Sequence, residues 1–487
     1  MASTSDSDKG EAPAGARDVA ALRAAAQTVF EALGAGAVAG FDRGAAIDES
    51  ELPEAGAELV DLISDMEDLA AAAAAVQARA AVELDRVRRA QEAERGVTAV
   101  RRGRGVAAEV GLAARISGSR GSRLLGFGKA LCHEMPHTMA ALAAGRLSPW
   151  RATLLVKESA CLPVEDRARV DRDLCRDPEV LAGLGDRQVG DAARTWCARE
   201  NAAAVVERRA RAESERRVSI RPAPDTMVYL TALLPVAQGV AAYAALSQHA
   251  DAARARGVDT GGDARTRGQV MADALVAAVT GRPEGSCAPV LVNLVMTDRA
   301  LFTGDDEPAV LPGYGPVPAA TARELVARSN DEAGTWVRRL YIAPGTGDLV
   351  AMDSRRRRAP KGLSQLIDLR DGGRCRVAWC DAPTRHVDHV VPAAQGGPTE
   401  KHYLQGTCEA HNYAKAAPGW QAEPAQPDTG SRHRVVTTTP TGHTYSSTAP
   451  PLPGAQEHAY LPTELRRVAD PSPGERMLAD ISWRRVA

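Results

Sequence analysis

The most constraining feature of this sequence is a set of four candidate metal ligands near its C-terminus. Cys375 and Cys380 form one closely spaced pair, and after 27 intervening residues Cys408 and His411 form a second pair. A structural Zn²⁺ ion takes four such sulfur and nitrogen ligands, with each pair on one tight turn, in a closed site. The surrounding segment has few large apolar side chains and needs such a cross-link to fold. The spacing therefore predicts a structural zinc site.

Polar residues suited to phosphodiester hydrolysis lie within and beside this pattern. Asp388 and His389 fall between the two pairs, and Asn412 follows His411 directly. A carboxylate and an amide oxygen can hold a hard divalent cation such as Mg²⁺. A neutral imidazole nearby can accept the proton of an attacking water, and Lys415 can add a positive charge next to a phosphate. The enclosed residues therefore indicate phosphodiester chemistry.

Charge is distributed unevenly along the chain. The whole chain carries a net charge of −2, from 60 Lys and Arg and 62 Asp and Glu, which excludes a generally polycationic protein. Residues 354–420 contain 11 Lys or Arg and 6 Asp or Glu, so this segment alone carries +5. A basic module on an otherwise acidic chain is expected where one part meets a polyanion. The candidate nucleic-acid-binding residues are Lys415, Arg374, Arg376, Arg355, Arg356, Arg357 and Arg358.

The C-terminal pattern resembles the HNH endonucleases, in the form whose ββα-metal core is stapled by zinc. The resemblance rests on three segments, Asp388–Pro392, Gly396–Thr399 and Cys408–Asn412. His411 stands where a fourth cysteine is more usual, and zinc accepts either ligand. The resemblance implies a metal-dependent endonuclease that hydrolyses DNA phosphodiester bonds, with DNA as its partner, structural Zn²⁺ and catalytic Mg²⁺ or Mn²⁺.

The resemblance also implies roles for individual residues. It makes His389 the general base, and Asp388 and Asn412 the ligands of the catalytic cation. The central family position, usually an Asn that ties the loop and orients the base, is Tyr403 here. A phenol hydroxyl cannot reproduce the paired donor and acceptor of an amide, although His402 can compensate. Two alternatives therefore stay open beside an active nuclease: a zinc-stabilised DNA-binding protein with weak or no catalysis, and a zinc domain that docks another protein.

The N-terminal part of the chain has a different pattern. From residue 18 to about residue 205 it is rich in Ala and Leu, with apolar residues at helical spacing. Three segments, Gly121–Leu147, Arg221–Thr280 and Leu294–Pro318, resemble the N-terminal domain of the actinobacterial DUF222 proteins, also called 13E12-repeat proteins. This resemblance implies a mostly helical domain and says little about chemistry.

The predicted fold class is α+β and multidomain. A mostly helical N-terminal domain with a small embedded β-region is followed by a small zinc-bound ββα-metal (HNH) domain. The predicted boundaries are a disordered tail (1–17), a helical domain of DUF222 type (18–330), a connecting hairpin (331–353), the HNH domain (354–420), and a Pro-rich linker, hairpin and tail (421–487).

Local patterns predict several elements. Glu58–Arg95 reads as one long amphipathic helix or two joined end to end, and Ser148 with Pro149 marks a helix start. The other expected elements are a hairpin of Val218–Ile220 and Met227–Leu234, helices at 236–256 and 265–281, a strand at Val290–Thr297, a loop at Leu301–Pro318, a hairpin of Trp336–Ile342 and Asp348–Asp353, and a hairpin at Arg434–Ser446.

The sequence also indicates a cytoplasmic protein without a membrane partner. Its N-terminus lacks the apolar core of a signal peptide, and Pro235 divides the longest uncharged stretch, Val228–Leu246, into a strand-like and a helix-like half. The five cysteines outside the C-terminal cluster are isolated and read as small core residues. The long N-terminal helix is a candidate contact with a second copy of the chain.

Overall fold

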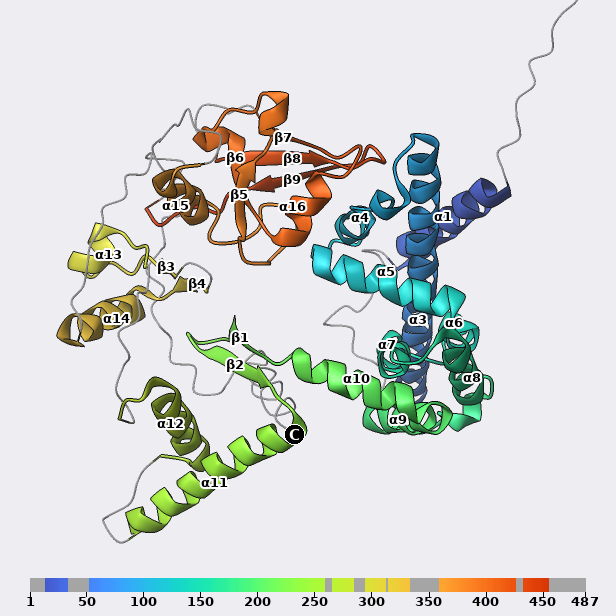
Figure 1. Ribbon diagram of the computed structural model, residues 1–487, viewed down its shortest axis with the longest axis horizontal. Coiled ribbons are helices and arrows are strands. Elements are labelled where there is room, and N and C mark those ends of the chain that lie inside the picture. Colours follow the sequence, from blue (N-terminus) through green and yellow to red (C-terminus); the bar gives the residue numbers. More distant parts are fainter. Residues whose placement is uncertain are drawn as a thin grey trace, which may run out of the picture. The chain divides into compact units, whose positions relative to one another are not determined.

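The computed structural model describes residues 14–33, 52–258, 265–283, 294–311, 314–332, 359–425 and 432–454. These residues are mostly helical, with small antiparallel sheets (Figure 1). The helices are α1 (Ala14–Ala32), α3 (Leu52–Glu94), α4 (Val106–Ala113), α5 (Gly118–His133), α6 (Pro136–Ala143), α7 (Pro149–Ser159), α8 (Val164–Cys175), α9 (Asp186–Glu200), α10 (Ala202–Ser214), α11 (Val236–Val258), α12 (Arg267–Thr280), α13 (Asp298–Phe302), α14 (Ala319–Glu332), α15 (Lys361–Arg370) and α16 (Glu409–Lys415).

The strands form four antiparallel sheets within the described residues. Three sheets have two strands and the fourth has three, in the order β7-β8-β9. The strands are β1 (Arg217–Pro222), β2 (Val228–Leu233), β3 (Ala309–Leu311), β4 (Gly315–Val317), β5 (His386–His389), β6 (Leu404–Thr407), β7 (Gln421–Pro424), β8 (Arg434–Thr438) and β9 (Thr444–Thr448). The mixture of helices and small sheets agrees with the predicted α+β class.

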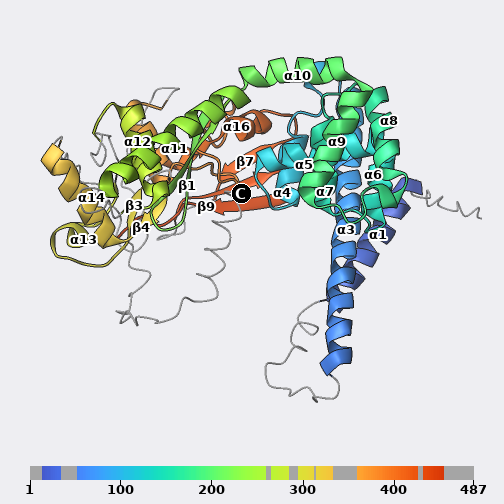
Figure 2. The same cartoon turned by 90° about the horizontal axis from the view of Figure 1, so that it is seen from below.

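The chain divides into two compact units, residues 1–69 and 70–487. In the first unit, α1 begins at Ala14, so the last four residues of the predicted tail, 14–17, are helical. Helix α3 begins at Leu52 and continues into the second unit, and Figure 2 shows it as one unbroken helix. Of the two alternatives predicted for Glu58–Arg95, one long helix or two joined end to end, the structure has the single helix.

The main core of the second unit lies among its helices. Ala71 and Ala78 on α3 pack in one cluster with Leu131, Leu155 and Leu174 from α5, α7 and α8, and both ribbon views show α6–α9 side by side (Figures 1 and 2). Two isolated cysteines also lie in this core, in line with the sequence. Burial raises the pKa of the Cys175 and Cys197 thiols to about 11, so both stay protonated at neutral pH.

Local capping signals act as the sequence indicates. The side chain of Ser148 accepts a hydrogen bond from the Arg151 amide at 3.3 Å, and Pro149 occupies the first turn of α7. Helices α4 and α5 approach closely because glycine lines the contact. A Cβ atom on Gly121 would lie 2.2 Å from the Ala107 carbonyl oxygen, so only glycine fits there.

The β-regions follow the predictions in part. The hairpin β1–β2 and the helices α11 and α12 are confirmed. The loop predicted at Leu301–Pro318 is wrong in its centre, because β3 pairs with β4 and buries Ala309 and Val317 against Ala322. Of the strand predicted at Val290–Thr297, only residues 294–297 are described, and Val295 forms a single bridge to Val310. The hairpin predicted at residues 336–353 lies outside the described residues.

The C-terminal module extends beyond the boundary predicted at residue 420. Strand β7, predicted as part of a linker, pairs with β8, and the hairpin β8–β9 agrees with the one predicted at Arg434–Ser446. Ala422 and Val435 from this sheet bury their side chains with Val390, which directly follows β5. The three-stranded sheet therefore belongs to the same packed module. Within the described residues, no helix combines the length and apolar character needed to cross a bilayer.

Candidate metal centre and active site

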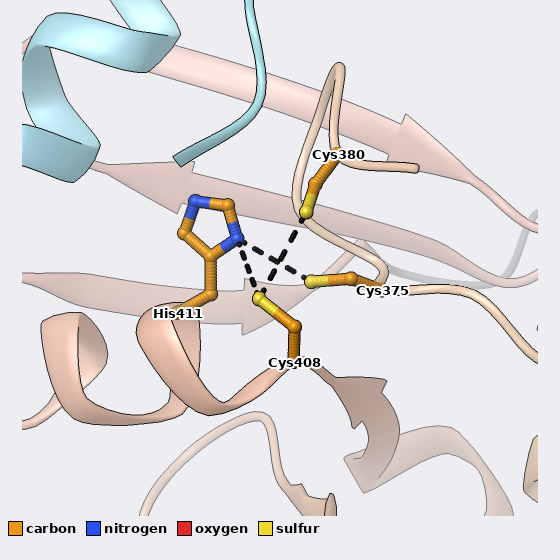
Figure 3. Close-up of side chains that lie close together, drawn as sticks. All are labelled: Cys375, Cys380, Cys408 and His411. Carbon is orange, nitrogen blue, oxygen red and sulfur yellow. Dashed lines mark hydrogen bonds between the residues drawn. The ribbon is translucent and has the colours of Figure 1, made fainter. Parts of the chain in front are cut away.

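The four predicted zinc ligands converge in one buried cluster (Figure 3). The Nδ1 atom of His411 lies 3.4 Å from the sulfur atoms of both Cys375 and Cys408, and the sulfurs of Cys380 and Cys408 are 3.9 Å apart. Ligands at tetrahedral Zn²⁺ with ordinary bond lengths stand about 3.8 Å apart for two sulfurs and about 3.6 Å apart for sulfur and nitrogen. The ligand atoms therefore fit a structural zinc ion.

The four side chains of the cluster shift one another's pKa values strongly. Hydrogen bonding to Cys380 and Cys408, together with burial, raises the pKa of the Cys375 thiol, whereas hydrogen bonds from Cys375 and Cys380 lower the pKa of Cys408. Burial lowers the pKa of His411, but its hydrogen bonds to Cys380 and Cys408 outweigh burial and raise it to about 9. Zinc binding displaces these protons because only thiolates and a neutral imidazole are ligands.

Short-range structure positions both ligand pairs. The Cys375 amide donates to the Ala382 carbonyl at 2.9 Å, and the Cys380 amide donates to the Val377 carbonyl at 3.1 Å, which closes a tight turn between the two sulfurs. Cys408 is the N-cap of α16, and His411 lies on the first turn of that helix. The ligands thus come from one loop and one helix start, as the spacing predicts.

The N-terminal part of the second unit contacts the Cys/His cluster directly. A Cβ atom on Gly118, at the start of α5, would lie 2.9 Å from the Nε2 atom of His411. The nitrogen of His411 that does not face the sulfurs is therefore covered by the backbone of α5. Glycine is required at this position because any side chain would collide with the imidazole ring.

Strands β5 and β6 and helix α16 form a strand–strand–helix unit around the predicted catalytic residues. Asp388 on β5 lies opposite Gln405 on β6 in the antiparallel register. The ammonium group of Lys415, on the last turn of α16, forms an ion pair with the Asp388 carboxylate and donates to the His389 carbonyl. Lys415, predicted to contact phosphate, is thus held at Asp388 in a half-buried position.

His389 lies at the end of β5, and its side chain is 6% exposed. Its Nε2 atom lies 2.9 Å from the hydroxyl oxygen of Thr399, which closes the glycine turn beginning at Gly396. Sequence reasoning used this turn only as part of the family pattern and missed the contact. A threonine directly after Gly-Gly-Pro is the signal that could have indicated a hydroxyl contact to His389.

The remaining predicted catalytic positions lie on the same unit. The side-chain carbonyl oxygen of Asn412 accepts a hydrogen bond from the Thr407 hydroxyl at 3.4 Å, and Asn412 precedes Lys415 by one turn of α16. The backbone of Tyr403 contacts β5, since its carbonyl accepts from the Val390 amide at 2.7 Å. The structure therefore brings Asp388 and Lys415 into contact, with Asn412 one helical turn from Lys415.

A buried ion network that the sequence did not reveal holds the loop around Tyr403. The guanidinium group of Arg370, 2% exposed, donates to the carbonyls of Lys401 and Leu404 at 2.6 and 2.8 Å. Its charge is balanced by Asp371, whose carboxylate lies 2.8 Å away. Residues on both sides of Tyr403 are thus tied to α15, which fixes the start of β6.

The predicted nucleic-acid contacts separate into three groups. Arg376 is buried, lies 3.3 Å from the Asp371 carboxylate and donates to the Ser447 carbonyl at 2.8 Å, so its assignment to nucleic acid is wrong. It joins α15 to the three-stranded sheet instead. Arg374 is partly exposed and lies 3.9 Å from Asp381. Residues 355–358 lie outside the described residues.

A buried histidine makes the module sensitive to acid. Burial, reinforced by Arg370 and Arg376, lowers the pKa of His433 to about 3, and its Nε2 atom lies 2.9 Å from the His402 carbonyl oxygen. A histidine in the unfolded chain has a pKa of about 6.5. Below that pH the unfolded chain therefore binds a proton that the folded chain does not. Folding stability should therefore fall as the pH drops from 6.5 toward 3, by at most about 1.4 kcal/mol per pH unit.

Urea unfolding measured across this pH range tests the prediction. The variant His433→Gln should lose stability less steeply on acidification than the parent chain. Both proteins share the acid sensitivity of the Cys/His cluster, so only the difference in slope reports on His433. Identical slopes would show that His433 is not the titrating group.

The comparisons with known proteins identify the larger part of the chain. A family model, the domain of unknown function DUF222, matches residues 63–371, which is more than half of the sequence. The chain belongs to the DUF222 family. The DUF222 match supports the resemblance seen in the N-terminal segments, and it ends four residues before Cys375, so the Cys/His cluster lies outside it. No curated protein and no solved structure matches the chain.

Proposed function

We propose that residues 359–454 form a metal-dependent endonuclease of the HNH type that hydrolyses DNA phosphodiester bonds. The observation that carries the proposal is the ion pair of Asp388 and Lys415 where β5 contacts α16, with His389 next along β5 and its carbonyl accepting from Lys415. The helix of this strand–strand–helix unit begins at Cys408, a predicted zinc ligand. The carboxylate and the ammonium group thus meet beside the Cys/His cluster.

In this proposal His389 is the general base. The hydroxyl of Thr399 at 2.9 Å holds the imidazole ring in one orientation, which is the positioning that a catalytic base needs. The ammonium group of Lys415 lies at the same edge and can bind a phosphate oxygen. In the family the central Asn holds the loop together. Here Arg370 would do this instead, because it donates to backbone carbonyls on both sides of Tyr403.

The oxygen atoms of Asp388 and Asn412 would hold the catalytic cation. Mg²⁺ and Mn²⁺ prefer such donors and complete their shells with waters and substrate phosphate oxygens. The Asp388 carboxylate is paired with the Lys415 ammonium, so a divalent cation would displace this ion pair and leave Lys415 to bind phosphate. A bound divalent cation would neutralise the charge that develops on the phosphate.

A zinc-stabilised DNA-binding protein without catalysis is the second candidate. The observation that favours it is the burial of His389, which is 6% exposed and has one ring nitrogen bonded to Thr399. A base in that position reaches a substrate water only through its other nitrogen or after a local opening. The two candidates make opposite predictions for DNA cleavage and the same prediction for DNA binding.

Plasmid nicking across a series of divalent ions tests the function, and Tyr403→Asn separates the candidates. The parent chain should nick supercoiled DNA with Mg²⁺ or Mn²⁺. Because Arg370 and the Val390 amide already tie the loop through backbone atoms, Tyr403→Asn should change the rate by less than about tenfold, a small fraction of a general base's contribution. Tyr243→Asn, on the exposed surface of α11, is the matched control.

Each outcome favours one candidate. If Tyr403→Asn raises the nicking rate by more than about a hundredfold, the scale of a general-base contribution, Tyr403 strongly reduces the activity of the parent. Retained DNA binding with no cleavage under any ion, in parent and variant alike, would favour the non-catalytic candidate.

A further inference from the structure

A second concentration of cationic residues lies outside the C-terminal module, in residues 95–123. This segment of the DUF222 domain contains seven arginines and one acidic residue, Glu109. Glu109 is 4% exposed and is bonded to Arg88 and to the Thr441 hydroxyl, so it adds no negative charge to the surface. Six of the arginines are exposed: Arg95, Arg101, Arg104, Arg115, Arg120 and Arg123. We call these six residues the arginine surface.

The charge of the arginine surface is not balanced locally. Within the described residues, none of its six members forms an ion pair with a carboxylate. Helix α10, also rich in arginine, differs: its three arginines lie between two glutamates, and Arg211 pairs with Glu207 at 2.6 Å. Like charges gathered without counter-charges repel one another unless a polyanion binds them.

The arginine surface lies next to the proposed nuclease site. A cleft of about 930 Å³ is lined on one side by Arg101 and Arg104 and on the other by Ala410, Tyr413 and further residues of α16. Lys415 on the same helix reaches Asp388. Helix α16 therefore contacts both the cleft that holds Arg101 and Arg104 and the ion pair of Asp388 and Lys415.

Packing fixes the two parts to each other. A Cβ atom on Gly105 would lie 2.6 Å from the indole nitrogen of Trp420, and the hydroxyl of Thr441 donates to Glu109 at 2.6 Å. The loop that carries Arg101 and Arg104 and the helix α4 that follows it are thus held against the C-terminal module at Trp420 and Thr441.

We propose that the arginine surface binds the phosphate backbone of the double-stranded DNA that the C-terminal module cleaves. The inference rests on the proposed function for its substrate. A helix is about 10–12 Å across and a turn of B-DNA is about 34 Å long, so one duplex spans both places. Phosphate contacts of this kind hold the register of the duplex and carry no sequence information.

Salt-dependent DNA binding by the full-length chain tests the proposal. Fluorescence anisotropy of a labelled 30-base-pair duplex is recorded across a KCl series without added divalent ions, for the parent and for Arg101→Gln/Arg104→Gln. Each lost phosphate contact lowers the slope of log affinity against log salt by about 0.9, so the double variant should lower it by about 1.8 and weaken binding by roughly 10- to 60-fold at 0.1 M salt. The control Arg208→Gln/Arg209→Gln removes the same charge from exposed positions on α10.

The outcomes separate this proposal from the proposed function. A second variant, Arg120→Gln/Arg123→Gln, is measured in the same way. If both double variants keep the DNA affinity and the salt slope of the parent, the arginine surface does not bind DNA, even if the parent chain nicks plasmid. An equal loss in the α10 control would also overturn the proposal, because the effect would then be one of net charge. Preference for single-stranded DNA would overturn the assignment to duplex. A loss confined to the arginine surface supports the proposal even if no cleavage is found.

Discussion

Replacing His389 with alanine should reduce divalent-dependent plasmid nicking by about 10²- to 10⁴-fold, the usual contribution of a general base. The imidazole lies at the end of β5, with Thr399 holding one nitrogen, whereas the other histidine of this strand, His386, lies at its exposed start. The loss should appear in the rate and not in DNA affinity, because the ring is buried rather than placed on the surface.

Two controls make this result specific. His386→Ala, three residues earlier on the same strand, should nick within a few-fold of the parent. The zinc content of both variants should equal that of the parent, since neither residue belongs to the Cys/His cluster. A His389→Ala protein that cuts as well as the parent would remove His389 from the mechanism.

Replacing Cys408 with serine should abolish zinc binding and unfold the C-terminal module. Structural zinc sites contribute apparent binding free energies of about 10–16 kcal/mol, which equals or exceeds the whole stability of an ordinary domain. Cys408 has an added role, since it is the residue from which α16 begins. The helices of the main core, α5–α9, bury their own apolar cluster and should remain folded.

Metal analysis and circular dichroism measure both effects. The parent should contain one zinc per chain and Cys408→Ser none, with loss of near-ultraviolet signal from the module and most of the helical far-ultraviolet signal retained. Cys161→Ser, a half-buried cysteine outside the cluster, should keep its zinc. Full zinc occupancy in Cys408→Ser would show that the ion is not held by these four residues.

The features that the sequence predicted well are those encoded over short distances. The ligand pairs sit on a single turn and a single helix start, Ser148 caps α7 through a contact three residues away, and α3 follows from an uninterrupted helical pattern. Each depends on residues within a few positions of one another, so the spacing alone carries the information. The ion and the catalytic chemistry remain predictions of that pattern.

The features that the sequence did not predict arise between distant segments. Arg376 reads as a surface charge beside a zinc ligand, yet Asp371 and the Ser447 carbonyl, 71 residues away, bury it. The residues of strand β7 have the composition of a Pro-rich linker, and they form a strand because β8, later in the chain, pairs with them. The seven arginines of residues 95–123 are visible in the sequence, but only the fold shows that α16 lies across a cleft from Arg101.

The glycine at position 118 has a thermodynamic consequence for the whole protein. Because the backbone of α5 covers the outer face of His411, anything that loosens that helix also alters the environment of the His411 imidazole. Coupling between two binding equilibria is reciprocal. If the Cys/His cluster holds an ion, its affinity for that ion and the packing of α5 on His411 would therefore rise and fall together.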